Sequence, residues 1–172
     1  MKTVVVYESH WGNTEAIARA IADGIGPDAV ALTTDAAVGD VVADADLIVA
    51  GAPVMALRLP TDDTLAKLGE STDEPRPDVS HPSMRDWLAG LPHRNGFGAA
   101  FETRLRWSPG GATGAIEKGL AAAGYRRLIP GRKFVVSGGK GPLRAGELDS
   151  ARAWGAELGR AITAACGAVA AR

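Results

Sequence analysis

The chain has 172 residues, 46% of them apolar and 23% charged, which fits one domain with a substantial core. Its formal net charge of −1 and its single cysteine, Cys166, exclude a basic nucleic-acid binder and an internal disulfide. No apolar run approaches the roughly 20 residues that span a bilayer. We therefore expect a single domain over residues 1–172 that is cytoplasmic, with no nucleic-acid partner and no membrane insertion.

Strand and helix patterns alternate in the first third of the chain. The run Val4-Val5-Val6 is β-branched, and isoleucines then recur at helical spacing from Ile17 to Ile25. The next strands are shorter apolar runs. The elements expected are strands at Thr3–Tyr7, Ala29–Thr33 and Leu47–Gly51, a helix at Asn13–Ile25, and a short helix or turn at Val38–Ala43.

Residues 58–82 have a different composition. They are rich in Pro, Asp, Glu, Thr and Ser, and their apolar residues show weak periodicity. We interpret the acidic pairs Asp62-Asp63 and Asp73-Glu74 as solvated loop charges. So long a connection in a compact domain is functional or loosely ordered, and a lid and a docking surface are both open interpretations.

The alternation resumes after this loop. Ser83 is placed as an N-cap with Asp86 three residues later, a pattern typical of a helix start. The elements expected are helices at Ser83–Leu91, Gly114–Ala123 and Glu147–Ala170, a strand at Gly98–Phe101, and a fifth strand in two parts, Arg127–Ile129 and Lys133–Val136, bent at Pro130-Gly131. Five alternations of strand and helix predict an α/β sandwich with a mostly parallel sheet, whose ligand lies beyond the carboxyl ends of the strands.

The most informative loop joins the first strand to the first helix and reads Ser9-His10-Trp11-Gly12-Asn13-Thr14. It offers hydroxyl groups, a glycine that allows close approach, and the free N–H groups of a helix start. It contains neither the triphosphate motif G-x-x-x-x-G-K-[ST] nor the dinucleotide motif G-x-G-x-x-G. The loop therefore indicates a site for a single phosphate monoester.

This strand, loop and helix resemble the signature of the flavodoxin-like family, whose specified positions are filled by Val5-Val6-Tyr7, Ser9, Gly12, Thr14, Ala18 and Ile21. The resemblance implies a three-layer flavodoxin-like sandwich, a five-stranded parallel sheet of order 2-1-3-4-5, and FMN as the cofactor. Its phosphate would be held by Ser9, His10, Trp11, Gly12, Asn13 and Thr14. Many flavodoxins have a hydroxyl residue in place of Trp11, which would shield the phosphate or pack without touching the ligand.

The resemblance also implies that the flavin ring lies between the loops after the third and fourth strands. The first loop would contribute Ala52, Pro53, Val54, Met55 and Ala56, and the second Glu102, Thr103, Arg104 and Trp107. Trp107 is the only aromatic residue of these loops placed to stack on the ring, and packing beneath its own loop is the alternative.

Two features of these loops lead to a hypothesis about the flavin. Met55-Ala56 lacks the glycine that eases a change to positive φ, a change that electron-carrier flavodoxins make on reduction. Arg104 and Arg106 outnumber Glu102, and a nearby cation would favour a reduced anionic flavin. We hypothesise a leaning toward two-electron chemistry and a raised redox potential.

Three functions remain open at this level. The resemblance favours a flavoprotein that transfers electrons from a reductase to an acceptor, which is a redox partner protein or a small molecule. The alternatives are an NAD(P)H-dependent FMN quinone reductase and a flavin-free interaction domain. The three histidines are scattered, so we expect no metal site, and no residue pattern indicates a catalytic nucleophile. The loop Ser137–Pro142 borders the ligand, receives a partner, or is a simple turn.

Overall fold

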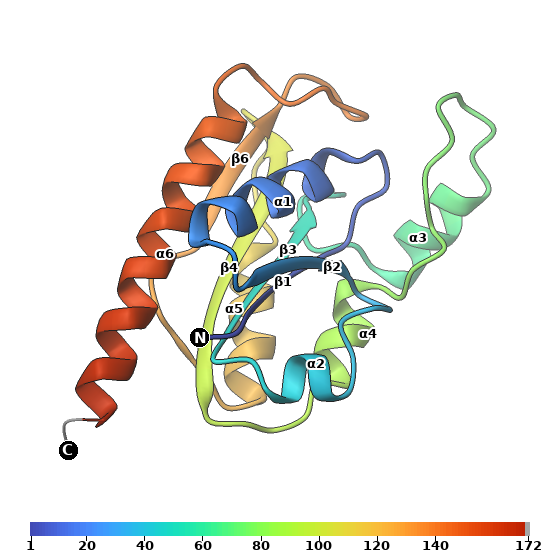
Figure 1. Ribbon diagram of the computed structural model, residues 1–172. Helices are drawn as coiled ribbons and strands as arrows, with labels where there is room; N and C mark the ends of the chain where they lie inside the picture. Colours follow the sequence, from blue (N-terminus) through green and yellow to red (C-terminus); the bar gives the residue numbers. More distant parts are fainter. Residues whose placement is uncertain (171–172) are drawn as a thin grey trace.

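A computed structural model describes residues 1–170 as a parallel sheet between two layers of helices (Figure 1). The spatial order is β2-β1-β3-β4-β5, with β6 also paired to β4, and every strand pair is parallel. This confirms the predicted order. The strands are β1 Thr3–Tyr7, β2 Ala29–Thr33, β3 Leu47–Pro53, β4 Gly96–Leu105, β5 Tyr125–Arg127 and β6 Arg132–Val136.

The predicted fifth strand does consist of two parts, but the first, β5, ends at Arg127, where the prediction places its start. Its first part, β5, pairs with the start of β4 at Gly96–Gly98, and its second part, β6, pairs with the end at Phe101–Leu105. Leu128 still donates to the Gly98 carbonyl, and the pairing is interrupted after it, around Pro130, which has no N–H to donate. β4 is longer than expected, and this length carries its last residues to the functional edge of the sheet.

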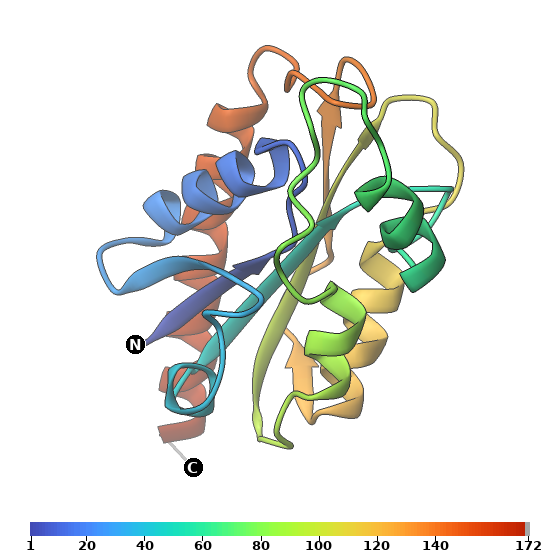
Figure 2. The same cartoon turned by 90° about the vertical axis from the view of Figure 1, so that its right-hand side faces the viewer.

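Helices cover both faces of the sheet (Figure 2). α1 and α6 pack together on one face, and α4 and α5 lie on the other. The helices are α1 Asn13–Ile25, α2 Asp40–Ala43, α3 Asp62–Gly69, α4 Met84–Ala89, α5 Thr113–Ala122 and α6 Glu147–Ala170. No helix within residues 1–170 is long and apolar enough to cross a membrane.

The alternating side chains of β1 explain why its run is apolar throughout. Val5 packs with Ile21 of α1 and Trp154 of α6 in one core cluster. Val4 and Val6 point to the opposite face and belong to the cluster beneath α4 and α5. A central parallel strand is buried on both faces, so each successive residue meets an apolar layer.

The expectation of an unbroken loop over residues 58–82 is wrong, because α3 lies within it. The Thr61 hydroxyl accepts a hydrogen bond from the Thr64 N–H at 3.3 Å and caps the helix, and Asp62 and Asp63 occupy its first turn. These carboxylates favour the positive end of the helix dipole and are not loop charges. None of the eight residues is buried, so the periodic apolar pattern that reveals a longer helix is missing.

Candidate functional site

A cavity of about 420 Å³ lies beyond the carboxyl ends of β1, β3 and β4. This volume is within the range of small-molecule sites. Most of the predicted ligand residues line it: Ser9, His10, Trp11, Asn13, Thr14, Pro53, Val54, Met55, Ala56, Thr103 and Arg104. Two segments whose role the sequence left open also line it: residues 58–82, through Thr64, Leu68, Ser71 and Asp73, and the loop Ser137–Pro142, through Gly139 and Lys140. Leu105 and Val136, at strand ends, are not among the predicted ligand residues.

One end of the cavity presents hydrogen-bond donors without partners. Gly12 adopts a φ of 81° ahead of α1, and no side chain caps the N–H groups of that helix. The Ser9 hydroxyl is buried and has no hydrogen-bond partner among the described residues. Because a buried hydroxyl normally finds a partner, an oxygen-rich ligand here would satisfy it. The Thr14 and Thr103 hydroxyls are 2.8 Å apart and tie the helix start to β4.

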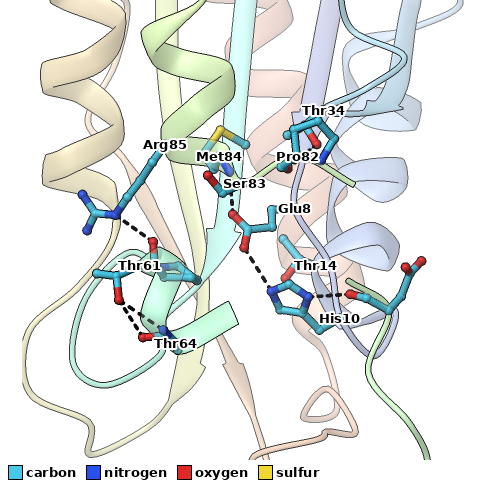
Figure 3. Close-up of polar contacts among 12 residues, drawn as sticks. Glu8, His10, Thr14, Thr34, Thr61, Thr64, Pro82, Ser83, Met84 and Arg85 are labelled. Carbon is cyan, nitrogen blue, oxygen red and sulfur yellow. Dashed lines mark hydrogen bonds and ion pairs between the residues drawn. The ribbon is translucent and has the colours of Figure 1, made fainter. Parts of the chain in front are cut away.

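His10 turns away from solvent and joins the loop to distant parts of the chain (Figure 3). Its Nε2 lies 3.0 Å from Oε1 of buried Glu8, and its Nδ1 lies 2.6 Å from the Asp78 carbonyl oxygen. The other Glu8 oxygen accepts a hydrogen bond from the Met84 N–H at 2.7 Å, at the start of α4. Burial lowers the pKa of His10, but its bonds to Glu8 and Asp78 outweigh burial and raise the pKa above its usual value.

Residues 70–82 form a strap across this end of the cavity. The Trp11 indole N–H donates to the Pro75 carbonyl at 3.2 Å, and the Asp78 N–H donates to the His10 carbonyl at 2.8 Å. Lys140, from the loop before α6, donates to the Glu74 carbonyl at 3.1 Å. The long connection after β3 is therefore folded back on the predicted phosphate loop, where it covers one end of the cavity.

At the other end of the cavity, a tight turn follows β3. Met55 and Arg58 exchange backbone hydrogen bonds of 2.9 and 3.1 Å around Ala56 and Leu57, whose φ values are 46° and 68°. Ala56 already has a positive φ, the conformation that we expect to cost more for alanine than for glycine. The Gly111 N–H also donates to the Leu57 carbonyl, so paired backbone bonds hold two residues in a conformation that ordinarily favours Gly or Asn.

We expect the double substitution Ala56→Asn and Leu57→Gly to raise the free energy of unfolding by about 1 kcal/mol, because Asn-Gly suits this turn. Both side chains are exposed, so little packing is lost. Urea denaturation measures the change. The same Leu→Gly substitution at exposed Leu148, inside helix α6, is the control and should destabilise the protein. Destabilisation by the turn variant would contradict the strain argument.

The structure places four predicted ligand residues outside the cavity lining. The side chain of Ala52 lies in the core beneath α4 and α5, and Gly12 has no side chain that could line the cavity. Glu102 is fully buried and accepts bonds from the Ala112 and Thr113 N–H groups at the start of α5. Trp107 is 83% exposed and lines a neighbouring hollow, so it neither lines the cavity nor packs beneath its own loop.

The two arginines next to the cavity do not form a pair of free cations. Arg104 donates to Glu102 at 3.0 Å and to the Gly110 carbonyl at 2.9 Å, and both ionic side chains are buried. Arg106 instead lies over the Trp107 ring, 5.0 Å from its centroid. Because the charge of Arg104 is balanced, it gives no support to the hypothesis of a raised redox potential.

Comparison with solved structures identifies the fold. The chain superposes on a flavodoxin from the domain Archaea with a TM-score of 0.66 and 22% identity, over 95% of this chain and 99% of that one. A WrbA-like flavodoxin from Agrobacterium tumefaciens gives 0.57 and 18%, over 94% and 97%. Rubredoxin oxygen:oxidoreductase from Desulfovibrio gigas gives 0.61 and 19%, over 95% of this chain and 36% of that larger one.

Comparison of the sequence with family models and with curated proteins found no further relative. No family model matches the chain, and no curated protein matches it. At these identities the structural matches show the fold, which is flavodoxin-like, as the resemblance of the first loop predicted.

Proposed function

We propose that this protein, which has the flavodoxin-like fold, binds FMN in the cavity and transfers electrons between a reductase and an acceptor. The observation that carries the proposal is the buried, unpartnered Ser9 hydroxyl beside the uncapped start of α1. A helix N-terminus and a free hydroxyl together suit a phosphate monoester. The solved flavodoxins of the same fold support FMN as the molecule that contains this phosphate.

The phosphate would be held by the Ser9 hydroxyl and the N–H groups at the start of α1. Lys140 lines the same cavity and is the cation best placed to balance the phosphate charge. The flavin ring would lie at the apolar end of the cavity, which is lined by Val54, Met55, Leu68 and Leu105. FMN supplies the electron-transfer chemistry when bound, and these residues orient it and exclude water.

We expect Ser9→Ala to weaken FMN binding by at least about tenfold, because a hydrogen bond to a charged group is worth roughly 1.5–3 kcal/mol. Binding of riboflavin, which has no phosphate, should not change. Quenching of flavin fluorescence measures both affinities. Ser150→Ala, on α6 and outside the cavity, is the matched control. Equal losses for the two flavins would contradict the role of Ser9, and a wild-type protein that binds neither would favour the flavin-free alternative.

The quinone reductase alternative needs a separate experiment. The FMN-loaded protein is mixed with NADH or NADPH and a soluble quinone, and the nicotinamide absorbance is followed. An electron carrier requires a separate reductase, so we expect no rapid NAD(P)H consumption by this protein alone. Multiple turnovers without a reductase would identify the enzyme instead.

A further inference from the structure

A second hollow of about 760 Å³ adjoins the cavity and is open to solvent. It lies between the turn after β3, the β4–α5 loop and the segment after β6. Its apolar residues are unusually exposed: Trp107 by 83%, Leu57 by 52% and Leu105 by 44%. Exposed apolar side chains gathered in one place with a polar rim are typical of a protein interaction site.

The charges of this hollow all have one sign. Arg106 and Arg144 line it, and no carboxylate does. Within residues 1–170, neither guanidinium forms an ion pair, whereas the nearby Arg104 is neutralised by Glu102. The net charge of the whole chain is only −1, so this basic surface is a local feature and not a consequence of composition.

The hollow is also placed to communicate with the cavity. Leu105 and Val136 line both spaces, so these two side chains form the wall between them. A protein bound in the hollow would lie directly beside the proposed flavin site. Trp and Arg are the residues that most often dominate protein interfaces, and Arg106 already lies over the Trp107 ring.

We propose that this hollow is the docking surface for an acidic electron-transfer protein, whose carboxylates surround an apolar centre. The partner's carboxylates pair with Arg106 and Arg144, and its apolar centre covers Trp107 and Leu57. The proposal rests on the proposed function for its redox role. The open shape and the protruding indole favour a protein over a small ligand, which would be enclosed.

Isothermal titration calorimetry of the FMN-loaded protein tests this docking. The probes are an acidic [2Fe–2S] ferredoxin and the basic protein cytochrome c, at low and at physiological ionic strength. We expect binding to the ferredoxin that weakens as salt increases, and no comparable binding to cytochrome c. Trp107→Ala, Arg106→Glu and Arg144→Glu should each weaken ferredoxin binding by at least about tenfold.

Two control variants separate a local from a global effect. Arg160→Glu changes the net charge equally on α6, and Leu148→Ala removes an exposed apolar side chain there. Neither should alter ferredoxin binding. The proposal is overturned by tighter binding of cytochrome c, by absent ferredoxin binding, or by an equal effect of Arg160→Glu. Saturable binding of NADP⁺ that requires Trp107, without ferredoxin binding, would identify a small-anion site and overturn it as well.

The failure of docking and the failure of flavin binding are distinguishable. Flavin affinity is measured separately by fluorescence, and the ferredoxin titration is repeated without added FMN. Loss of FMN binding with retained, salt-dependent ferredoxin binding would reject the proposed function and leave an interaction surface. Normal FMN binding without ferredoxin binding would reject only the docking proposal.

Discussion

Replacement of Glu8 by alanine should lower the free energy of unfolding by about 3 kcal/mol, because it removes the shared partner of two buried hydrogen-bonding groups. Glu8 accepts bonds from His10 and from the Met84 N–H, and it is 3% exposed. Its loss leaves both of these buried groups without a hydrogen-bond partner and without access to water. Urea denaturation monitored by circular dichroism gives the change.

Two further variants establish that burial is the cause. Glu15→Ala removes an exposed helical ion pair with Arg19 and should cost only about 0.5 kcal/mol. The double variant Glu8→Ala and His10→Ala should be less destabilised than the sum of the single variants, because no buried imidazole remains without its partner. Equal effects of Glu8→Ala and Glu15→Ala would contradict the argument.

The same variant should loosen the strap. The His10 ring lies between Glu8 and the Asp78 carbonyl, so loss of Glu8 should weaken this contact, and we expect faster amide hydrogen exchange in residues 70–82 of Glu8→Ala. The strap covers the end of the cavity that we propose holds the phosphate, so faster release of bound FMN is the corresponding functional effect. Unchanged exchange in this segment would show that the strap does not depend on the contact between Glu8 and His10.

Glu102→Ala should lower the free energy of unfolding by about 3 kcal/mol for a related reason. Its carboxylate neutralises buried Arg104 and also accepts bonds of 2.6 and 2.9 Å from Ala112 and Thr113, where α5 begins. The negative charge additionally favours the positive end of that helix. Chemical denaturation measures the loss, with Glu15→Ala again the exposed control.

Glu102→Gln separates charge from hydrogen bonding. Glutamine preserves the shape and one acceptor oxygen, so it should be destabilised less than the alanine variant, and the difference reports the hydrogen bonds. If both substitutions were neutral, the buried pair would contribute nothing to stability. In that case the position of the β4–α5 loop would have to depend on other contacts, such as the bond between Gly111 and Leu57.

Local signals in the sequence were sufficient for most of the fold. Strand β1, helix α1 and the Ser83 cap of α4 appear where the apolar period and the capping residues placed them. Helix α3 was not predicted because it is short and exposed, so it has no apolar stripe to detect. The positive φ values at Ala56 and Leu57 escaped because side-chain preference opposes them, and only backbone pairing with Arg58 and Gly111 overcomes that preference.

The sequence by itself predicted the sheet order, through the flavodoxin-like signature, and identified the loop Ser9–Thr14 as part of the candidate site. Both depend on residues that are adjacent or one helical turn apart. Only the tertiary structure decided the charge and the covering of the site. Arg104 is neutralised by Glu102 on the same strand, His10 is tied to Asp78 of the distant strap, and Trp107 faces solvent. Electrostatics and burial depend on spatial neighbours, which local patterns do not record.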